Sequence, residues 1–294
     1  MNPIPAGKPV QLDVKEDQVT VKGEEFSVVF DKITGELVSY AAAGVELIAV
    51  PLRPNFWRAM VDNDRGNNLE ERSGIWRAAS MERRLLEFSY RAAPASADVR
   101  VRYALPTVPE SSCTLEYSIQ GDGTMDVRMR LTPGEGLPEI PEVGLLFAME
   151  GSFDLIKWYG KGPFENYSDR NSGTKIGKYE GLVKDQWVPY LRPQECGNKT
   201  EVRWASVENK AGTGFLFEGN TRFEFNALPY TPSEIEASDH AYKLPASDKT
   251  VIRLMAKQMG VGGDDSWGAK PHPEHILYAN REYSLALTLK IFGK

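Results

Sequence analysis

The chain has 294 residues, of which 41% are hydrophobic and 26% are charged, values that are ordinary for a soluble globular protein. A net charge of −6, with no block rich in Lys and Arg, excludes a non-specific polyanion partner such as nucleic acid. The apolar runs are far shorter than the roughly 20 residues that a membrane-spanning helix requires, so we expect no membrane partner.

The first residues, MNPIPAGKPVQLDV, indicate a Pro-rich tether that runs into a strand. They lack the charged region and the apolar region of a signal peptide. No linker composition divides the remaining sequence, so we expect a tether over 1–13 and a single domain over 14–294. Localisation in the cytoplasm or in the periplasm stays open, because it depends on sequence upstream of this chain.

Apolar and polar residues alternate with a period of two through most of the chain, which predicts β-strands. The clearest hairpin joins strands over 115–119 and 125–131 through the GDG at 121–123, where glycine tolerates positive φ. The last strand places alternate residues from Tyr283 to Ile291 on one face. Further strands are predicted around 26–30, 86–91, 98–105, 143–149, 201–207, 213–218, 222–226 and 250–257.

Helix-forming patterns are scarce in this sequence. One helix is predicted after Thr231, which heads a capping box with Glu234 and is followed by Pro232. A second short helix is expected to begin at Asn68. Many short strands with one or two short helices predict an all-β fold, a large antiparallel sandwich.

The cysteines and histidines do not predict a metal site. Cys113 and Cys196 lie far apart without CxxC spacing, and we expect two buried free thiols rather than a disulfide. His272 and His275 have the spacing of metal ligands only superficially, because Pro273 interrupts any helix that would align them. A third ligand is not evident.

Three segments are more polar, aromatic and Gly-rich than a sandwich core requires: 51–68, 158–181 and 259–268. Sugar-binding surfaces have this composition, because aromatic rings stack on pyranose C–H groups while carboxylates, amides and Arg bind hydroxyls. The alternative is structural: an Asx-rich turn in the first segment and a charge network in the second. The candidate residues are Arg58, Asp62, Asp64, Glu165, Asn166, Asp169, Arg170, Asp264, Asp265 and Trp267.

The sequence does not identify a catalytic pair for glycoside hydrolysis. Such chemistry requires two carboxyl groups about 5–5.5 Å or about 6.5–9.5 Å apart. Asp264 and Asp265 are adjacent, and neighbouring residues of an extended loop point to opposite sides. Glu165 and Asp169 are candidates by residue type only. No Ser-His-Asp, P-loop or HExxH pattern is present either, so we assign no catalytic residue to this chain.

Five ordered motifs carry a family resemblance: PNFWRAMVDNDRGNN, EIPEVGLLFAM, WYGKGPFENYSDR, VPYLRPQECGNKTEVRW and MGVGGDDSWG. The sequence resembles, from about residue 14 to its end, the C-terminal small-chain domain of large, LacZ-type β-galactosidases of glycoside hydrolase family 2. The resemblance implies a β-supersandwich of the galactose-mutarotase-like type. It also implies an excised domain or the separately encoded small subunit of a two-chain enzyme.

The resemblance places the catalytic glutamates, together with Mg²⁺ and Na⁺, in a TIM barrel, which alone would need about 250 residues. This chain is therefore expected to bind no cofactor and to be inactive alone. The implied partners are the barrel and other domains of the parent enzyme, which is expected to be a homo-oligomer. The implied substrate is a terminal β-D-galactoside.

The resemblance implies a substrate-contacting role for one residue, Trp267, as an apolar wall for the sugar. Asp264 and Asp265 are then expected to shape the loop that aims the indole, and the segment Gly44 to Val50 corresponds to a loop near the active-site entrance. No catalytic role attaches to the DND and ENYSDR motifs, which favours structural roles for their residues.

Two alternatives remain: a freestanding carbohydrate-binding module that uses the same aromatic loop, and an aldose 1-epimerase. An epimerase needs a His acid and a Glu base, and no familiar histidine motif surrounds His240, His272 or His275.

Overall fold

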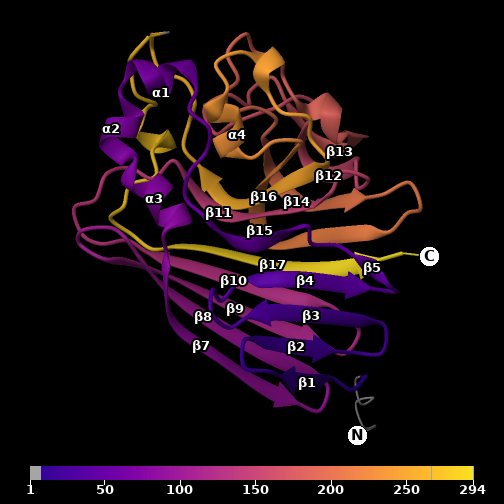
Figure 1. The fold of residues 1–294 in the computed structure, drawn as a ribbon. Coiled ribbons are helices and arrows are strands. Elements are labelled where there is room, and N and C mark those ends of the chain that lie inside the picture. The colour runs from indigo at the N-terminus through magenta and orange to yellow at the C-terminus, as the bar shows by residue number, and fades with distance from the viewer. Residues whose placement is uncertain (1–7, 266, 294) are drawn as a thin grey trace, which may run out of the picture.

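The computed structural model describes residues 8–265 and 267–293, and its fold is two layers of antiparallel β-sheet (Figure 1). A small N-terminal sheet lies over part of a large sheet that forms the rest of the molecule. The rings of Phe30 and Tyr117 meet between the layers with their centroids 4.9 Å apart. The predicted all-β class, a large antiparallel sandwich, is confirmed.

The N-terminal sheet consists of the consecutive antiparallel strands β1 to β5. The next strand, β6, links the two sheets, because it pairs with β4 only at Leu37 and Leu52 and with β11 of the large sheet at four positions. The strands of the N-terminal sheet alternate buried and partly exposed residues because one face packs on the large sheet. β1 begins inside the stretch that the sequence predicts as a tether, so the ordered strand starts earlier than 14. The strands are β1 Gln11–Val14, β2 Gln18–Lys22, β3 Phe26–Asp31, β4 Leu37–Ala42, β5 Val45–Glu46 and β6 Val50–Asn55.

The large sheet contains the predicted hairpin, in which β9 and β10 pair in register from Ser112 with Thr132 to Ile119 with Met125. Two strands of this sheet were not predicted, β12 and β13, which overlap the two ends of the polar segment 158–181. The strands are β7 Arg84–Ala93, β8 Ser96–Leu105, β9 Ser111–Gln120, β10 Met125–Thr132, β11 Glu142–Glu150, β12 Leu155–Gly162, β13 Lys175–Leu182, β14 Lys199–Glu208, β15 Gly214–Leu228, β16 Lys249–Gln258 and β17 Tyr283–Phe292.

The prediction of separate strands over 213–218 and 222–226 is wrong, because β15 runs without a break from Gly214 to Leu228. Its middle is exposed and polar, which resembles a turn in the sequence. The strand continues through this stretch because its first half pairs with β17 and its second half with β16.

The described residues contain four short α-helices rather than one or two. Segment 62–66, interpreted as a turn, forms α1, and the helix expected from Asn68 is divided at Gly74 into α2 and α3. The capping box of α4 is confirmed, because Thr231 Oγ1 accepts the Glu234 N–H at 3.2 Å. The helices are α1 Asp62–Gly66, α2 Leu69–Ser73, α3 Ile75–Met81 and α4 Pro232–Ala237, with 3₁₀ turns Val183–Gln186, Ala241–Lys243 and Pro273–His275.

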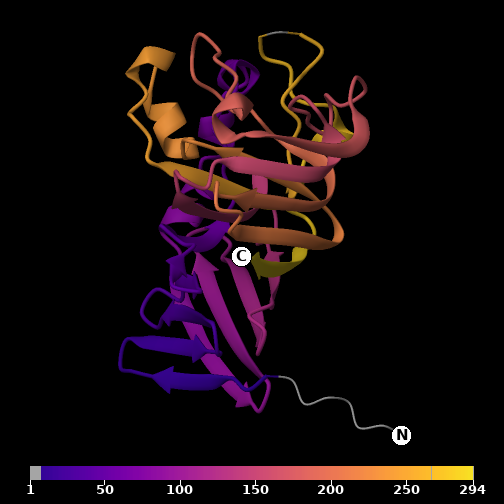
Figure 2. The ribbon, with the colours of Figure 1, turned by 90° about the vertical axis from the view of Figure 1, so that its right-hand side faces the viewer.

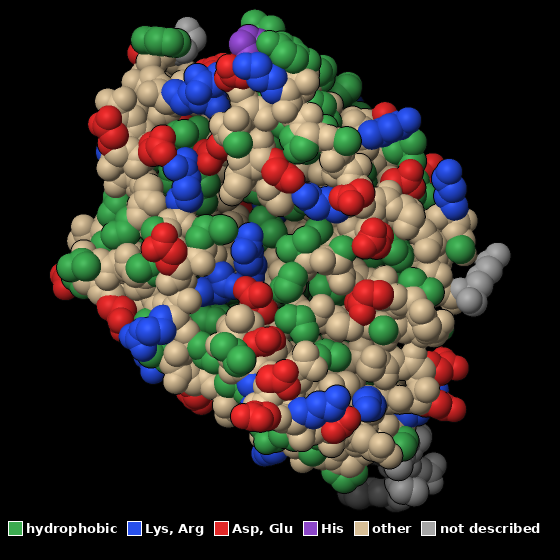
Figure 3. All heavy atoms as spheres, in the orientation of Figure 1, with side chains coloured by type: hydrophobic (Ala, Val, Ile, Leu, Met, Phe, Trp, Pro, Cys, Tyr) green, Lys and Arg blue, Asp and Glu red, His purple; other side chains and the backbone are tan. Residues whose placement is uncertain are grey.

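The core holds both cysteines as buried free thiols, which confirms that prediction. Burial raises the pKa of Cys113 to about 12. On the face shown in Figure 3, acidic and basic side chains are interspersed. No helix among the described residues is long and apolar enough to cross a membrane.

Candidate functional site around Trp267

Segments that are far apart in the sequence meet at one end of the molecule, at the top of Figures 1 and 2. They are helix α1, the loop 163–174 between β12 and β13, the loop 187–198 before β14, and the loop 259–272 after β16. The structure therefore brings together the DND, ENYSDR, RPQECGN and GGDDSW motifs. We call the last of these segments the Trp267 loop.

Trp267 lies on the surface of this end with 76% of its area exposed. Asp265 holds the backbone around it: Oδ1 accepts the N–H groups of Trp267, Gly268 and Ala269 at 2.9, 2.8 and 2.9 Å. These hydrogen bonds lower the pKa of the Asp265 carboxyl, those from Ala269 and Trp267 most. Asp265 thus shapes the backbone that carries the indole.

Helix α1 packs directly against the Trp267 loop. A β-carbon at Gly66 would lie 2.2 Å from the carbonyl oxygen of Trp267, so only glycine permits this approach. Asn63 Nδ2 donates to the carbonyl of Asp265 at 3.4 Å. The DND segment therefore acts as a support for the loop.

The base of the Trp267 loop is fixed by a buried ion pair between Arg58 and Asp64, both of which are almost completely inaccessible. Arg58 Nη2 donates to the carbonyl oxygen of Gly260 at 3.1 Å. Asp64 also accepts the Val61 N–H at 2.9 Å and so starts α1. Because both side chains are buried, neither Arg58 nor Asp64 can contact a sugar in this structure.

Asp169 attaches the ENYSDR loop to the Trp267 loop, because its Oδ2 accepts the Gly262 N–H at 2.7 Å. Glu165 joins its own loop to the loop 187–198: it accepts from Tyr190 Oη at 2.8 Å and from the Gly197 N–H at 2.7 Å, and it pairs with Arg170. These contacts agree with the structural alternative for the second polar segment.

The remaining candidates differ in accessibility. Asn166 is fully buried, and its Oδ1 accepts the Thr200 N–H at 2.8 Å. The Asp62 side chain is 56% exposed, and its Oδ1 lies 3.1 Å from Arg65 Nη1. Asp62 Oδ2 accepts from Gln194 Nε2, also at 3.1 Å. Of these two, only Asp62 can touch a ligand without a rearrangement.

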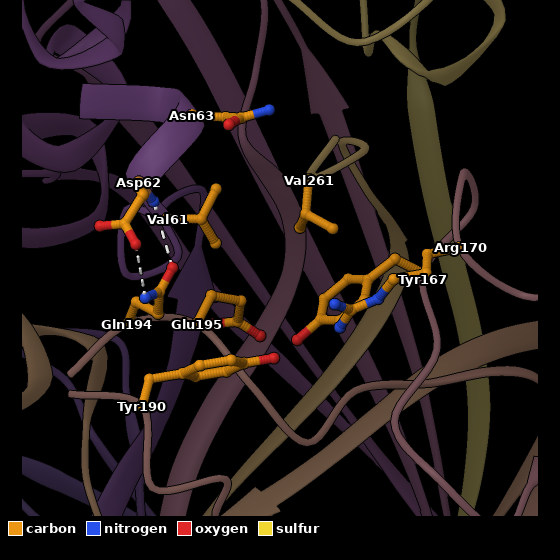
Figure 4. Close-up of a pocket in the computed structure, with 9 residues that line it drawn as sticks. All are labelled: Val61, Asp62, Asn63, Tyr167, Arg170, Tyr190, Gln194, Glu195 and Val261. Atoms are coloured by element: carbon orange, nitrogen blue, oxygen red, sulfur yellow. Dashed lines mark hydrogen bonds between the residues drawn. The ribbon is translucent and has the colours of Figure 1, made fainter. Parts of the chain in front are cut away.

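A pocket of about 200 Å³ opens between these segments (Figure 4). The Tyr167 hydroxyl points toward the Glu195 side chain across it, and burial raises the pKa of Tyr167 well above its usual value. Glu195 is held by Arg253, whose Nη2 donates to Oε1 at 2.6 Å. The pocket is lined by Val61, Asp62, Asn63, Tyr167, Arg170, Tyr190, Gln194, Glu195 and Val261.

Sequence reasoning missed Tyr167, Tyr190, Gln194 and Glu195 as pocket residues. The ENYSDR and VPYLRPQECGN motifs could have indicated these residues, because both motifs combine polar and aromatic residues without the alternation of a strand. Only the fold shows that the two motifs face each other.

Asp264 does not pair with Asp265. Its Oδ1 lies 2.7 Å from His272 Nε2, and this hydrogen bond raises the pKa of His272. Among the described residues, no group of three or more His, Cys, Asp or Glu side chains is arranged to hold a metal ion.

The segment from Gly44 to Val50 is not near the Trp267 loop in this chain. It forms the turn between β4 and β5 and the link to β6, with Gly44 at a φ of +80°. β5 lies at the right of Figure 1, whereas α1 and the Trp267 loop lie at the upper left. Within one chain, the segment 44–50 and the Trp267 loop therefore lie at different places on the molecule.

The family described as "Beta galactosidase small chain" matches residues 22–289. A β-galactosidase from Priestia megaterium is 50% identical over 279 residues, which are 95% of this chain and 27% of that protein. The β-galactosidase small subunit of Latilactobacillus sakei is 32% identical, and the match covers 89% of this chain and 92% of that subunit.

Among solved structures, a galactose 1-epimerase from Lactobacillus acidophilus has a TM-score of 0.51 and 7% sequence identity. The match covers 97% of this chain and 99% of that one. At this identity the likeness concerns the fold alone, and it confirms the predicted galactose-mutarotase-like architecture. The chain spans about a quarter of the length of full-length relatives, and nearly all of the small subunit.

Proposed function

This chain belongs to the β-galactosidase small-chain family, and we propose that it completes the galactoside site of a β-galactosidase without supplying the catalytic carboxylates. In this proposal Trp267 forms an apolar wall against the sugar, and the rest of the site belongs to a larger portion of the enzyme. The reaction served is hydrolysis of terminal β-D-galactosides.

The observation that carries this proposal is the combination of an exposed indole with a constrained backbone. Trp267 is 76% exposed, yet Asp265, Gly66 and Arg58 fix the loop beneath it. Holding a large apolar ring in water is unfavourable unless a partner or ligand covers it. A sugar ring that stacks on the indole would provide that cover.

The carboxylates near the site support a non-catalytic role. Glu165 and Glu195 are engaged by Arg170 and Arg253, and Asp265 accepts three backbone N–H groups. A general acid or nucleophile must instead reach the glycosidic bond. We therefore propose that the catalytic glutamates and the Mg²⁺ and Na⁺ sites belong to a TIM barrel outside this chain.

The partner in this proposal is that larger portion, encoded either on the same polypeptide or separately. Similarity over nearly the full length of a β-galactosidase small subunit supports the possibility that the two portions are encoded as separate chains. A homo-oligomeric parent enzyme is part of the same proposal.

The experiment is an assay of the purified chain on a chromogenic β-galactoside, alone and after mixing with the large portion of a close relative. We expect no turnover by the chain alone and turnover by the mixture. Robust turnover by the chain alone, abolished by a point substitution within it, would overturn the proposal. Polarimetry with galactose tests for mutarotation, which we expect to be absent.

A further inference from the structure

The outer face of the large sheet carries four exposed arginines that the proposed function does not use. Arg100 and Arg102 in β8, and Arg128 and Arg130 in β10, alternate with buried apolar residues that face the core. Strand alternation therefore directs all four side chains to the same outer surface. We call this surface the arginine groove.

The strand register arranges these arginines in two rows around β9. Arg100 and Arg128 both stand opposite Glu116, and Arg102 and Arg130 both stand opposite Thr114. The rows lie about 7 Å apart along the strands, and the two arginines of a row lie about 10 Å apart across them. The Cα positions of the four arginines therefore lie at the corners of a rectangle.

The surface is hollowed beside three of these arginines, Arg100, Arg128 and Arg130. Two depressions of about 310 and 420 Å³ share Arg100, Glu116 and Arg128. The first extends over Arg130 to Ser284 of β17, and the second extends toward β8 and Ser118. The groove thus crosses several strands and is longer than one small anion requires.

Of the four arginines, Arg100 alone is paired with carboxylates among the described residues. Glu116 and Glu87 both lie 3.6 Å from Arg100. Within the described part of the chain, no hydrogen bond or ion pair engages the side chains of Arg102, Arg128 or Arg130. Three free guanidinium groups on one face contrast with a net charge of −6 for the whole chain.

One end of the groove is acidic, so the charge changes from negative to positive along the strands. Asp98 and Asp126 both stand opposite Ser118, one row beyond Glu116. Asp98 pairs with Arg91 at 3.5 Å, and Asp126 accepts from Thr288 Oγ1 at 2.6 Å. An anionic ligand is therefore attracted to the end that carries Arg102 and Arg130.

We propose that the arginine groove binds an acidic peptide segment of a protein partner in an extended conformation. In an extended peptide, residues i and i+2 point to the same side about 7 Å apart, which equals the spacing of Arg128 and Arg130 along β10. Guanidinium groups bind carboxylates through two parallel hydrogen bonds, so an Asp or Glu at each of these positions fits the pair.

The test uses the intact chain and a fluorescein-labelled peptide in which Glu alternates with Ser, followed by fluorescence anisotropy at low ionic strength. We expect saturable binding that weakens as salt is added, because the contacts lie at an exposed surface. The double substitution Arg128→Glu and Arg130→Glu should weaken binding by roughly tenfold or more. All variants are compared by circular dichroism to verify their fold.

The matched control is Lys210→Glu with Arg222→Glu, two exposed cations outside the groove with the same change in net charge. This control should alter the peptide affinity by less than about twofold. Replacing Arg128 and Arg130 with Lys keeps the charge but removes the planar fork, and binding should fall several-fold.

Three results would each overturn the proposal. The native chain could fail to bind the peptide, or both double-charge variants could lose binding equally, which would reveal an effect of net charge alone. Inorganic phosphate could displace the peptide at an equal concentration of anionic groups, which would indicate a simple anion site. A peptide of the same charge with its Glu residues contiguous should bind more weakly than the alternating one.

Discussion

Asp265 Oδ1 accepts the backbone N–H of Trp267 at 2.9 Å, within a loop that exposes the Trp267 indole to solvent. The Asp265 carboxylate is thus an acceptor for the loop backbone, as expected from the sequence. Its neighbour Asp264 is engaged by His272 on the outside of the loop. The two adjacent carboxylates have separate partners and separate roles.

Asp265→Ala should loosen the Trp267 loop, because three backbone N–H groups lose their common acceptor. In the assembled enzyme we expect KM to rise by roughly tenfold with a smaller change in kcat. Asp265→Asn retains the accepting Oδ1 and should restore most of the affinity. Steady-state kinetics on both variants checks this, and an Asn variant as impaired as the Ala variant would contradict it.

Gly66→Ala should displace the same loop from the other side, since a β-carbon there would lie 2.2 Å from the Trp267 carbonyl oxygen. We expect an intact fold with altered Trp267 fluorescence and, in the assembled enzyme, a raised KM. Gly173→Ala is the matched control, since nothing lies within 4 Å of its β-carbon position. Gly136→Ala would not serve, because Gly136 has a φ of +77°, which alanine rarely adopts. Equal effects of Gly66→Ala and Gly173→Ala would refute the close contact.

Glu224 makes stability depend on pH. Burial raises its pKa to about 7, so between its usual pKa of 4.5 and about 7 the folded state binds more protons than the unfolded state. Stability from this group is therefore present at low pH and is lost as pH rises through 7, at a cost on the order of 3 kcal/mol. Glu224→Gln should remove that loss.

Urea denaturation of both forms from pH 5 to pH 8 measures the effect. The Gln variant should gain stability relative to the native chain as the pH increases. A difference in free energy of unfolding that stays constant across this range would show that Glu224 does not titrate there.

Lys199 should produce the opposite slope. Burial lowers its pKa to about 8, and its Nζ donates to the Gly197 carbonyl oxygen at 2.9 Å. Between pH 8 and 10.5 the unfolded state binds more protons, so stability rises with pH over this window. Lys199→Met should abolish the rise and increase the free energy of unfolding at pH 7. The exposed Lys210→Met serves as the control, and identical slopes in both variants would contradict the assignment.

The sequence predicted the elements whose signals are local. The hairpin around 121–123 follows from strict alternation, and the helix after Thr231 follows from its capping box. Helix α1 was missed because Asp62, Asn63 and Asp64 favour a turn. The helix forms there because Arg58, buried at its start, fixes Asp64.

The candidate site was predictable only in part. The resemblance pointed to Trp267, and the structure exposes it. The partners that hold its loop lie far away in sequence: Asp169 binds Gly262, and Gly66 contacts the Trp267 backbone. Spacing along the chain carries no information about such contacts. The same holds for the arginine groove, which depends on the register of three strands.

The central claim is that Trp267 contributes to sugar binding in the assembled enzyme, and kinetics of Trp267→Ala on a β-galactoside tests it most directly. Loss of a stacked ring should weaken sugar binding by about 1–3 kcal/mol, seen mainly as a higher KM. Trp267→Phe should retain part of that affinity. Tyr242→Ala, which removes another exposed aromatic ring from a different loop, should leave the kinetics unchanged. Unchanged KM and kcat for Trp267→Ala would contradict the account.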